Sequence, residues 1–402
     1  MQQAIDCENT YCAHNYLPLP VVLIKGEGVW LWDENGNKYL DMMSAYSAVS
    51  HGHTNPRLLK TLIDQASKLC ITSRAFHTDT LGPFLKKLCE ISCLDMALPM
   101  NTGAEAVETA VKAARLWGYQ SKNIPENKAE IIVAKDNFHG RTISIISFSS
   151  EDDYKKDFGP FTPGFKVVDY NIESFKAAIT PNTCAILVEP IQGEAGIKIP
   201  PAGFLTELRA LCDQHNVLLI LDEIQSGLGR TGKTFAYQHE NIQPDGLILG
   251  KALGGGMLPV SAFLGRKKIM ELFQPGSHGS TFGGNPLAAA VGLEALTVLE
   301  EDKLVERSAE LGDYLLNKLS EIDTPLIREV RGRGLWVGVD FDPTHVSARE
   351  ICERLQKKGI LSKETHETVV RFAPPLIITK GEIDWTIEHF IATIQDVEKD
   401  IF

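Results

Sequence analysis

The chain has 402 residues, enough for two or three domains of ordinary size or for one large domain with an appendage. Hydrophobic residues make up 44% and charged residues 23%, so disordered, collagen-like and coiled-coil classes fit poorly. A net charge of −12 argues against general binding to nucleic acid or to an anionic membrane. Because no apolar run approaches the roughly 18 residues of a membrane span and the start has no leader pattern, a soluble, cytoplasmic protein is expected.

The eight cysteines predict neither disulfides nor a metal site. No Cys-x-x-Cys pair occurs, and the closest spacings lack a matching second pair or nearby histidines. Free thiols and no metal are therefore expected.

Strand-like runs on both sides of a turn predict an early β-meander over residues 21–46. Further along, short apolar runs alternate with segments of helical periodicity. These runs lack polar residues at alternate positions, which is typical of strands covered on both faces, so a mainly parallel sheet is predicted. The runs cover 96–101, 131–135, 184–190, 217–223, 246–252 and 260–265.

The pattern changes after about residue 290, where long helices precede β-rich runs and two further helices. A smaller α+β domain is predicted there, packed tightly because no linker rich in Gly, Pro or Ser precedes it. The predicted division has three parts: an N-terminal segment joining the small domain (1–45), a large α/β domain (46–290) and a small C-terminal α+β domain (291–402).

The segment Gly227–Thr234 matches the nucleotide-binding pattern G-x-x-x-x-G-K-[ST]. A phosphate loop must leave its strand directly, so that its amides and the following helix N-terminus face the phosphates. Here the apolar run ends at Leu221 and five residues intervene. A glycine-rich surface turn is the preferred interpretation, and a nucleotide-binding protein stays a remote alternative.

Two charged residues, Asp222 and Lys251, stand at the ends of successive apolar runs. A buried carboxylate needs a cationic partner, and a buried lysine tends to lose its charge and become a nucleophile. Pyridoxal phosphate meets both needs, because its ring nitrogen pairs with a carboxylate and its aldehyde with a lysine amine. Taken alone, Asp222 is equally explained as a cap or ion-pair partner, and Lys251 as a surface lysine.

Two loops offer donors for a phosphate group. Asn101–Ala104 lies between a predicted strand and a predicted helix, where backbone amides and the helix dipole favour an anion. His278–Pro286 contributes hydroxyls and glycines that allow close approach. Each loop alone is also explained as an ordinary helix cap.

Together, these motifs resemble the class III (subgroup II) pyridoxal-phosphate aminotransferases of fold type I. The similar segments follow the family's order from residue 101 to 375: NTGAEAVETA, NFHGRT, VEPIQGEAG, LLILDEIQSGLGRTG, LGKALGGGMLPVSA, GSTFGGNPLAAA and VRFAPP. The resemblance implies an α/β fold with a mainly parallel, mixed seven-stranded sheet in a large domain and a smaller α+β domain. It also implies pyridoxal 5'-phosphate as the cofactor.

By this resemblance, five residues would surround the cofactor ring. Lys251 would form the Schiff base and move the proton, and Asp222 would pair with the ring nitrogen. Gln225 would donate to the ring hydroxyl, while Phe138 and Ile224 would cover the two faces of the ring.

The phosphate contacts implied by the resemblance come from two subunits. Gly103 and Ala104 would donate backbone amides to the phosphate. Thr281 would reach the phosphate of the neighbouring subunit's cofactor, so a homodimer with shared active sites is expected.

Within the family, CAHNYLPLP, MMSAYSAVSHGH and RFAPPL are most similar to the ornithine δ-aminotransferases. That resemblance implies that Tyr16 and Arg141 hold the α-amino and α-carboxylate end of ornithine, and that Tyr46 narrows the pocket. Glu194 would pair with Arg371 while ornithine is bound and release it for the α-carboxylate of 2-oxoglutarate or glutamate.

The implied reaction transfers the δ-amino group of L-ornithine to 2-oxoglutarate by a ping-pong mechanism. Its products are L-glutamate and glutamate 5-semialdehyde, which cyclises to pyrroline-5-carboxylate. The alternative amine donors are N-acetylornithine, 4-aminobutyrate or another ω-amine. Ser50 and His51 depart from the Asn-Gln of the ornithine enzymes' pattern.

Overall fold

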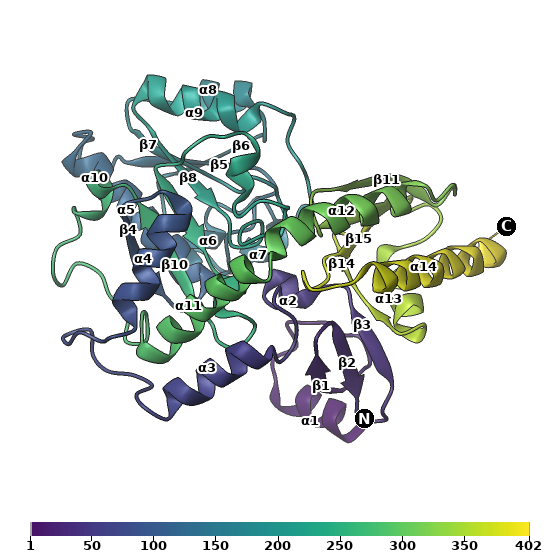
Figure 1. The fold of residues 1–402 in the computed structure, drawn as a ribbon. Helices are drawn as coiled ribbons and strands as arrows, with labels where there is room; N and C mark the ends of the chain where they lie inside the picture. The colour runs from purple at the N-terminus through teal and green to yellow at the C-terminus, as the bar shows by residue number, and fades with distance from the viewer. Residues whose placement is uncertain (1, 402) are drawn as a thin grey trace.

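The structure, a computed structural model, describes residues 2–401 and is built around a seven-stranded sheet of order β4-β10-β9-β8-β7-β5-β6 (Figure 1). Only β10 runs against its neighbours, so the sheet is mixed and mainly parallel, and the predicted fold class is confirmed. The strands are β4 (Met96–Met100), β5 (Glu130–Ala134), β6 (Phe165–Val168), β7 (Thr183–Val188), β8 (Leu218–Asp222), β9 (Gly246–Leu249) and β10 (Ser261–Gly265).

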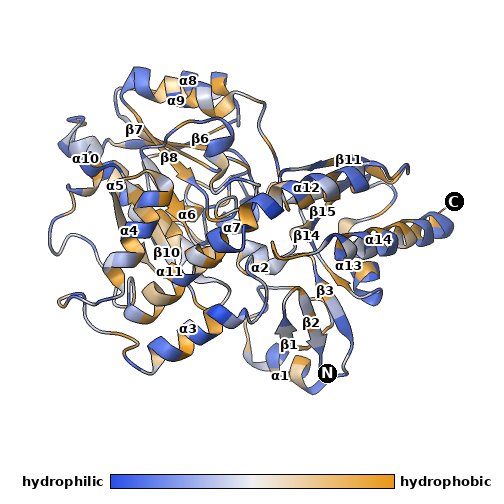
Figure 2. Cartoon of the chain, viewed as in Figure 1, coloured by the Kyte–Doolittle hydropathy of each residue, from blue (hydrophilic) through white to orange (hydrophobic). Residues whose placement is uncertain are grey.

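Helices cover both faces of this sheet, which explains why its strands are continuous apolar runs. In β8, Leu219 and Leu221 join one core while Leu218 and Ile220 join the other, because successive side chains point to opposite faces. Figure 2 shows these strands as mostly apolar between helices that turn polar sides outward. The helices are α3 (Pro56–Ala66), α4 (Leu81–Ser92), α5 (Gly103–Gln120), α6 (Ile143–Ile146), α7 (Asp152–Lys155), α8 (Ile172–Ala178), α9 (Phe204–His215), α10 (Lys267–Met270) and α11 (Pro286–Glu301), with the 3₁₀ turns η1 (Ala236–His239) and η2 (Lys251–Gly254).

A second, antiparallel sheet lies in the C-terminal part of the chain, in the order β11-β12-β15-β14. Figure 1 shows α11 leading out of the large sheet's layer into α12 of this smaller unit. Its elements are α12 (Leu304–Ser320), β11 (Ile327–Gly332), β12 (Val337–Phe341), α13 (Ala348–Lys357), β14 (Lys363–Thr365), β15 (Val369–Phe372) and α14 (Lys380–Ile401).

The N-terminal segment forms the predicted meander and shares a sheet with the C-terminal part. The short strand β13 (Ile360–Leu361) pairs in parallel with β3, which supports the proposed grouping of residues 1–45 with the small domain. The segment contains α1 (Gln2–Tyr11), β1 (Leu23–Glu27), β2 (Trp30–Asp33) and β3 (Lys38–Asp41). The helix α1 was not predicted, and none of its residues is buried.

The turn after β3, labelled α2 (Ser44–Ser47), has an unusual backbone. All four of its residues have positive φ, from 46° at Ala45 to 73° at Ser47. Residues other than glycine rarely adopt positive φ values. Such backbone strain is found most often at functional sites. Asp41 holds the start of the turn, because its Oδ1 accepts hydrogen bonds from Met43 N and Ser44 N, both at 2.8 Å.

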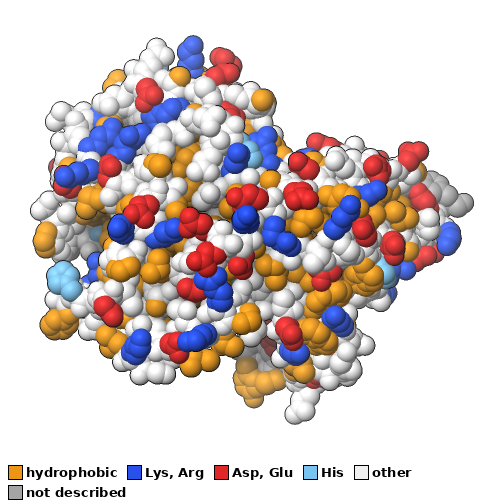
Figure 3. All heavy atoms as spheres, in the orientation of Figure 1, with side chains coloured by type: hydrophobic (Ala, Val, Ile, Leu, Met, Phe, Trp, Pro, Cys, Tyr) orange, Lys and Arg blue, Asp and Glu red, His pale blue; other side chains and the backbone are white. Residues whose placement is uncertain are grey.

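The distribution of charged side chains on the surface and the moderate apolarity of the helices agree with the ordinary composition of the chain. Figure 3 shows acidic and basic side chains intermingled over the face drawn. Within residues 2–401, no helix combines the length and the apolarity needed to cross a membrane.

Candidate active site

A cavity of about 240 Å³ opens at the carboxyl ends of β8 and β9, where ligands bind in sheets of this kind. It brings together seven of the residues predicted to surround a cofactor. These seven are Gly103, Ala104, Phe138, Asp222, Ile224, Gln225 and Lys251. Five further residues line it: His139, Gly140, Glu189, Ile191 and Ser226.

Lys251 reaches the cavity from the first residue of η2, just after β9. Its φ of 46° is a strained value for a residue other than glycine. This backbone conformation sets the direction in which the side chain leaves the backbone. Burial lowers the pKa of its amine, although the carboxylates of Glu194, Asp222 and Glu189 act in the opposite direction. The lowered pKa favours the neutral amine, which is the nucleophilic form.

Asp222 ends β8 with its carboxylate held by two donors. His139 Nδ1 lies 2.7 Å from Oδ2, and the backbone amide of Ile224 lies 3.0 Å from Oδ1. Because a carboxylate only accepts, the Nδ1 of His139 must carry the proton. Burial lowers the pKa of His139, but the hydrogen bond and charge of Asp222 outweigh it, and the pKa is raised overall. His139 therefore fixes the Asp222 carboxylate at the wall of the cavity.

The amino end of α5 forms the opposite wall of the cavity. Thr102 and Glu105 make a capping box, in which Glu105 accepts from the amides of Asn101 and Thr102. The first helical residues, Gly103 and Ala104, line the cavity, and first-turn amides have no partner within their own helix. A Cβ on Gly103 would lie 2.9 Å from Ile224 Cδ1, so the glycine keeps this wall open. The amino end of α5 is therefore suited to binding a phosphate group.

A guanidinium–carboxylate pair lies beside the cavity. Arg371 on β15 is 4% exposed, and its Nη1 lies 2.8 Å from Glu194 Oε1. The same Glu194 oxygen accepts from Gln225 Nε2 at 3.0 Å. Burial raises the pKa of Glu194, but the charge of Arg371 and the hydrogen bonds from Arg371 and Gln225 together outweigh burial, so the pKa is lowered. The Tyr46 ring, carried by the strained α2 turn, lies 4.9 Å from the Arg371 guanidinium carbon.

The sequence was also compared with known proteins. The family model described as Aminotransferase class-III matches residues 11–394. The chain is a class-III aminotransferase.

The aminotransferase is similar to curated proteins named ornithine aminotransferase. One from Halalkalibacterium halodurans is 60% identical over 385 residues, covering 96% of each chain. One from Geobacillus sp. is 59% identical over 388 residues, covering 96% of this chain and 97% of that protein.

Solved structures give the same family. The ornithine aminotransferase of Toxoplasma gondii superposes with a TM-score of 0.98 at 44% identity, covering 99% of this chain and 95% of the other. An acetylornithine aminotransferase from Elizabethkingia anophelis superposes with a TM-score of 0.89 at 45% identity, covering 98% and 99%.

The residues of the cavity fit pyridoxal phosphate. Three independent features match three parts of that molecule: a carboxylate held by His139, a lysine of lowered pKa, and the amide wall at the start of α5. Phe138 and Ile224 line the cavity as apolar surfaces for a ring. The Gln225 amide nitrogen is already bonded to Glu194, which ties this predicted ring contact to the guanidinium–carboxylate pair.

Besides Tyr46, Glu194 and Arg371, three more predicted residues lie outside this cavity. Arg141 is exposed, and its guanidinium carbon lies 3.4 Å from the centre of the Tyr154 ring. Tyr16 is 78% exposed in a segment without regular structure. Thr281 is also exposed and lines a separate hollow with Thr72 and Arg74, so a single chain does not bring it to its own cavity.

Tyr154 is a neighbour of the site that sequence reasoning missed, because no motif includes it. It packs edge-on against Phe138 with 6.2 Å between ring centres, and it lies under Arg141. Burial raises the pKa of Tyr154, while the charge of Arg141 partly opposes that effect.

The turn Gly227–Thr234 does not form a phosphate loop. It lies five residues beyond β8, and the only helical element directly after it is the four-residue 3₁₀ turn η1. Lys233 lines a different hollow, together with His239 and Arg333. The segment is a glycine-rich turn, as preferred, but the prediction that it lies at the surface is wrong, because Leu228, Arg230 and Thr231 are buried.

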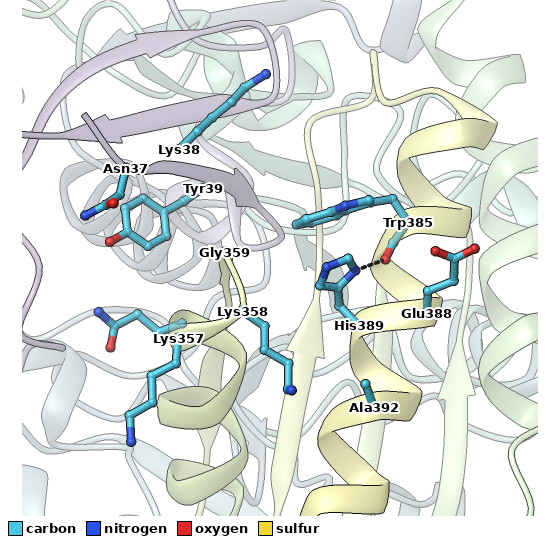
Figure 4. A pocket seen from close by; sticks show the side chains of 11 residues that line it. Asn37, Lys38, Tyr39, Lys357, Lys358, Gly359, Trp385, Glu388, His389 and Ala392 are labelled. Atoms are coloured by element: carbon cyan, nitrogen blue, oxygen red, sulfur yellow. Dashed lines mark hydrogen bonds between the residues drawn. The ribbon is translucent and has the colours of Figure 1, made fainter. Parts of the chain in front are cut away.

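A groove of about 710 Å³ lies between β3, the end of α13 and α14 (Figure 4). Two of its cations are engaged elsewhere, since Lys358 pairs with Asp396 at 2.8 Å and Lys38 lies 3.8 Å over the Trp30 ring. His389 Nδ1 donates to the Trp385 carbonyl oxygen of its own helix at 2.8 Å. None of the predicted site residues lines this groove.

Proposed function

We propose that this aminotransferase transfers the δ-amino group of L-ornithine to 2-oxoglutarate. The products are L-glutamate and glutamate 5-semialdehyde, which cyclises to pyrroline-5-carboxylate, and pyridoxal 5'-phosphate is the cofactor. The observation that carries the proposal is the Glu194–Arg371 pair beside the cavity.

The pair suits an enzyme that must accept two unlike substrates in one cavity. 2-Oxoglutarate carries two carboxylates, and a guanidinium binds a carboxylate through two parallel hydrogen bonds. Ornithine presents a distal amine instead, and an unmasked Arg371 would repel it. Glu194 neutralises Arg371 in the resting state, and it frees Arg371 when a dicarboxylate competes for the guanidinium.

The far end of ornithine is assigned to Tyr16 and Arg141. Arg141 offers a cation to the α-carboxylate and is oriented by its contact with the Tyr154 ring. The Tyr16 hydroxyl accepts from the α-amino group, and Tyr46 narrows the space next to Arg371.

When bound, pyridoxal phosphate supplies an aldehyde for the amino group and a protonated ring that draws electrons from the reacting carbon. Asp222, held by His139, keeps a proton on the ring nitrogen. The neutral Nζ of Lys251 takes a proton from the substrate carbon and returns it. Gly103 and Ala104 would hold the phosphate through their amides, and Ile224 would offer an apolar surface to the ring.

We further propose that the active unit is a homodimer. Thr281 lines a hollow other than the cavity, and exposed apolar side chains occur in the same two chain segments, at Phe282 with 55% and at Phe76 with 67%. Exposed apolar clusters of this kind mark association surfaces. A second chain would cover them and would receive Thr281 at its phosphate.

N-Acetylornithine is the second candidate donor, because a solved structure at 45% identity is an acetylornithine aminotransferase. The deciding experiment measures glutamate formation from 2-oxoglutarate with ornithine, N-acetylornithine or 4-aminobutyrate as the donor, and with the Lys251→Ala variant as the blank. Ornithine is expected to give the highest kcat/KM. A higher value with N-acetylornithine would replace the proposed donor.

A further inference from the structure

Glu189 occupies the point where three strand ends of the large sheet converge. It follows β7 directly, and it is 5% exposed. The loop after β5 passes on one side with Phe138, and the loop after β7 turns back on the other with Gly193. From the end of β6, the Tyr170 hydroxyl donates to the Glu189 carbonyl oxygen at 2.7 Å.

The two carboxylate oxygens of Glu189 hold two different loops. Oε2 accepts from the Phe138 amide at 3.0 Å, and Oε1 accepts from the Gly193 amide at 3.3 Å. One loop carries the aromatic ring that faces the cavity. The other leads directly into Glu194, which pairs with Arg371.

The Gly193 end of this link has little freedom to move. A Cβ there would lie 2.6 Å from Gln225 Oε1 and 2.8 Å from Trp336 Cζ2, so the loop backbone is pressed against both. Gln225 in turn donates to Glu194. A shift of the Gly193 amide is therefore passed on to the carboxylate that masks Arg371.

We infer that Glu189 is a positioning residue that sets the Phe138 ring and the Glu194 carboxylate together, by holding the backbone amides of Phe138 and Gly193 with one carboxylate. The inference rests on the proposed function for the meaning of the Glu194–Arg371 pair. It adds a single side chain that links the ring-covering loop to the substrate-discriminating loop.

The protonation behaviour of Glu189 is consistent with this role. Burial raises the pKa of its carboxyl to about 7, against the charge of His139 and the two amide hydrogen bonds, which lower it. A buried carboxyl without structural use is costly, and its amide partners offset that cost.

Glu223 provides a matched control. It is also a buried glutamate next to a strand end, it is 1% exposed, and burial raises its pKa to about 7. Its carboxylate likewise holds two backbone amides, those of Ala236 at 2.6 Å and Tyr237 at 2.9 Å. Those amides belong to η1, away from the cavity.

The first test follows amide hydrogen exchange at single-residue resolution in the protein without substrate. In the wild type, the Phe138 and Gly193 amides are expected to exchange more slowly than the other amides of their loops. In Glu189→Gln and Glu189→Ala, both should exchange about tenfold faster or more, with alanine the larger effect, because hydrogen bonds to charged groups are lost. In Glu223→Gln the acceleration should fall on Ala236 and Tyr237 instead.

The second test separates the two substrates. A looser Glu194 masks Arg371 less well, so Glu189→Gln should raise the KM for ornithine by about tenfold relative to the KM for 2-oxoglutarate. Glu223→Gln should leave that ratio unchanged. If ornithine supports no turnover at all, the proposed function fails and the exchange measurement alone decides on the inference.

Unprotected Phe138 and Gly193 amides in the wild type would overturn the inference, and this outcome needs no variant that folds. So would an exchange increase spread evenly over the chain in the Glu189 variants. An unchanged KM ratio together with faster exchange at both loops would remove the link to Arg371.

Discussion

Glu194 and Arg371 form an ion pair at 2.8 Å in which the arginine side chain is 5% exposed and the glutamate side chain 22%. The exposed fraction of the glutamate is the larger, so the carboxylate is the partner with room to move. The arginine is fixed on β15 in the small sheet. This asymmetry makes Glu194 the moving part of the proposed switch.

Removing the Glu194 carboxylate should make the enzyme favour dicarboxylate substrates over ornithine. In Glu194→Ala, Arg371 stays unpaired, so the KM for ornithine should rise about tenfold while that for 2-oxoglutarate falls or stays constant. Steady-state kinetics of each half-reaction give both values. Glu329→Ala, which removes an exposed partner of Arg331, serves as the control and should change neither. An equal rise in both KM values would contradict the switch.

Tyr16 should matter for one half-reaction only. In Tyr16→Phe the acceptor for the α-amino group of ornithine is lost, so kcat/KM for ornithine should fall about tenfold or more, while the glutamate half-reaction is spared. Stopped-flow absorbance of each half-reaction measures the two rates separately. Equal losses in both halves would exclude Tyr16 from the donor's α-end.

Lys251 should determine the colour of the protein. Lys251→Ala is expected to lose the near-visible absorption band of the loaded enzyme and at least roughly 10²-fold in turnover. An absorption spectrum after cofactor addition and dialysis shows the first effect. Lys233→Ala, in the glycine-rich turn, should keep both the band and the turnover. A colourless Lys233 variant that has lost ATP binding would instead revive the nucleotide alternative.

Shared active sites predict complementation between two inactive variants. Thr281→Glu places a negative charge at the partner's phosphate and should abolish activity, as Lys251→Ala does. In a hybrid dimer of the two variants, one site carries both changes and the other carries neither. Co-expressed, differently tagged chains should therefore recover about half of the wild-type activity per dimer. Hybrids as inactive as the parents would show that Thr281 does not act across subunits.

His51 should make the fold sensitive to acid. Burial lowers the pKa of this fully buried ring to about 4, against the hydrogen bond to the Ala295 carbonyl, which raises it. The unfolded chain therefore takes up a proton near pH 6.5 that the folded state refuses, so stability is lost as the pH falls from 6.5 toward 4. At pH 5 the loss is about 2 kcal/mol.

His51→Gln removes the titrating ring and retains a donor for Ala295. The drop in apparent Tm between pH 7.5 and pH 5 should therefore be smaller in His51→Gln than in the wild type. Differential scanning fluorimetry at the two pH values measures it, with His14→Gln, at an exposed position just after α1, as the control. An unchanged drop would show that other groups govern acid stability.

The sequence predicted the parts of the site that stand at the ends of apolar strands. Asp222 and Lys251 could be found because a charged residue at the end of a buried strand is costly unless it has a partner or a function. Gly103 could be found because its motif lies at the start of a predicted helix. Tyr154 and Glu189 could not be found in this way. Their roles depend on contacts between loops that follow different strands, and those contacts leave no periodic pattern.

The fold shows the same limit. The large sheet followed from its continuous apolar runs, whereas β6 was missed because its four residues are only partly buried and carry a lysine. The left-handed α2 turn contains no glycine, so the sequence gives no signal for its positive φ values. Its conformation is imposed by Asp41 and by the packing around Tyr46 rather than by local preference.

The pairing of β3 with β13 also has a consequence for how the protein is made. Leu40 and Ile360 are neighbours in the finished sheet, but a ribosome delivers them far apart in time. At about 5–20 residues per second, the amino-terminal meander waits roughly 15 to 60 s for the strand that completes it. During synthesis, the edge of β3 stays unpaired until β13 has been made.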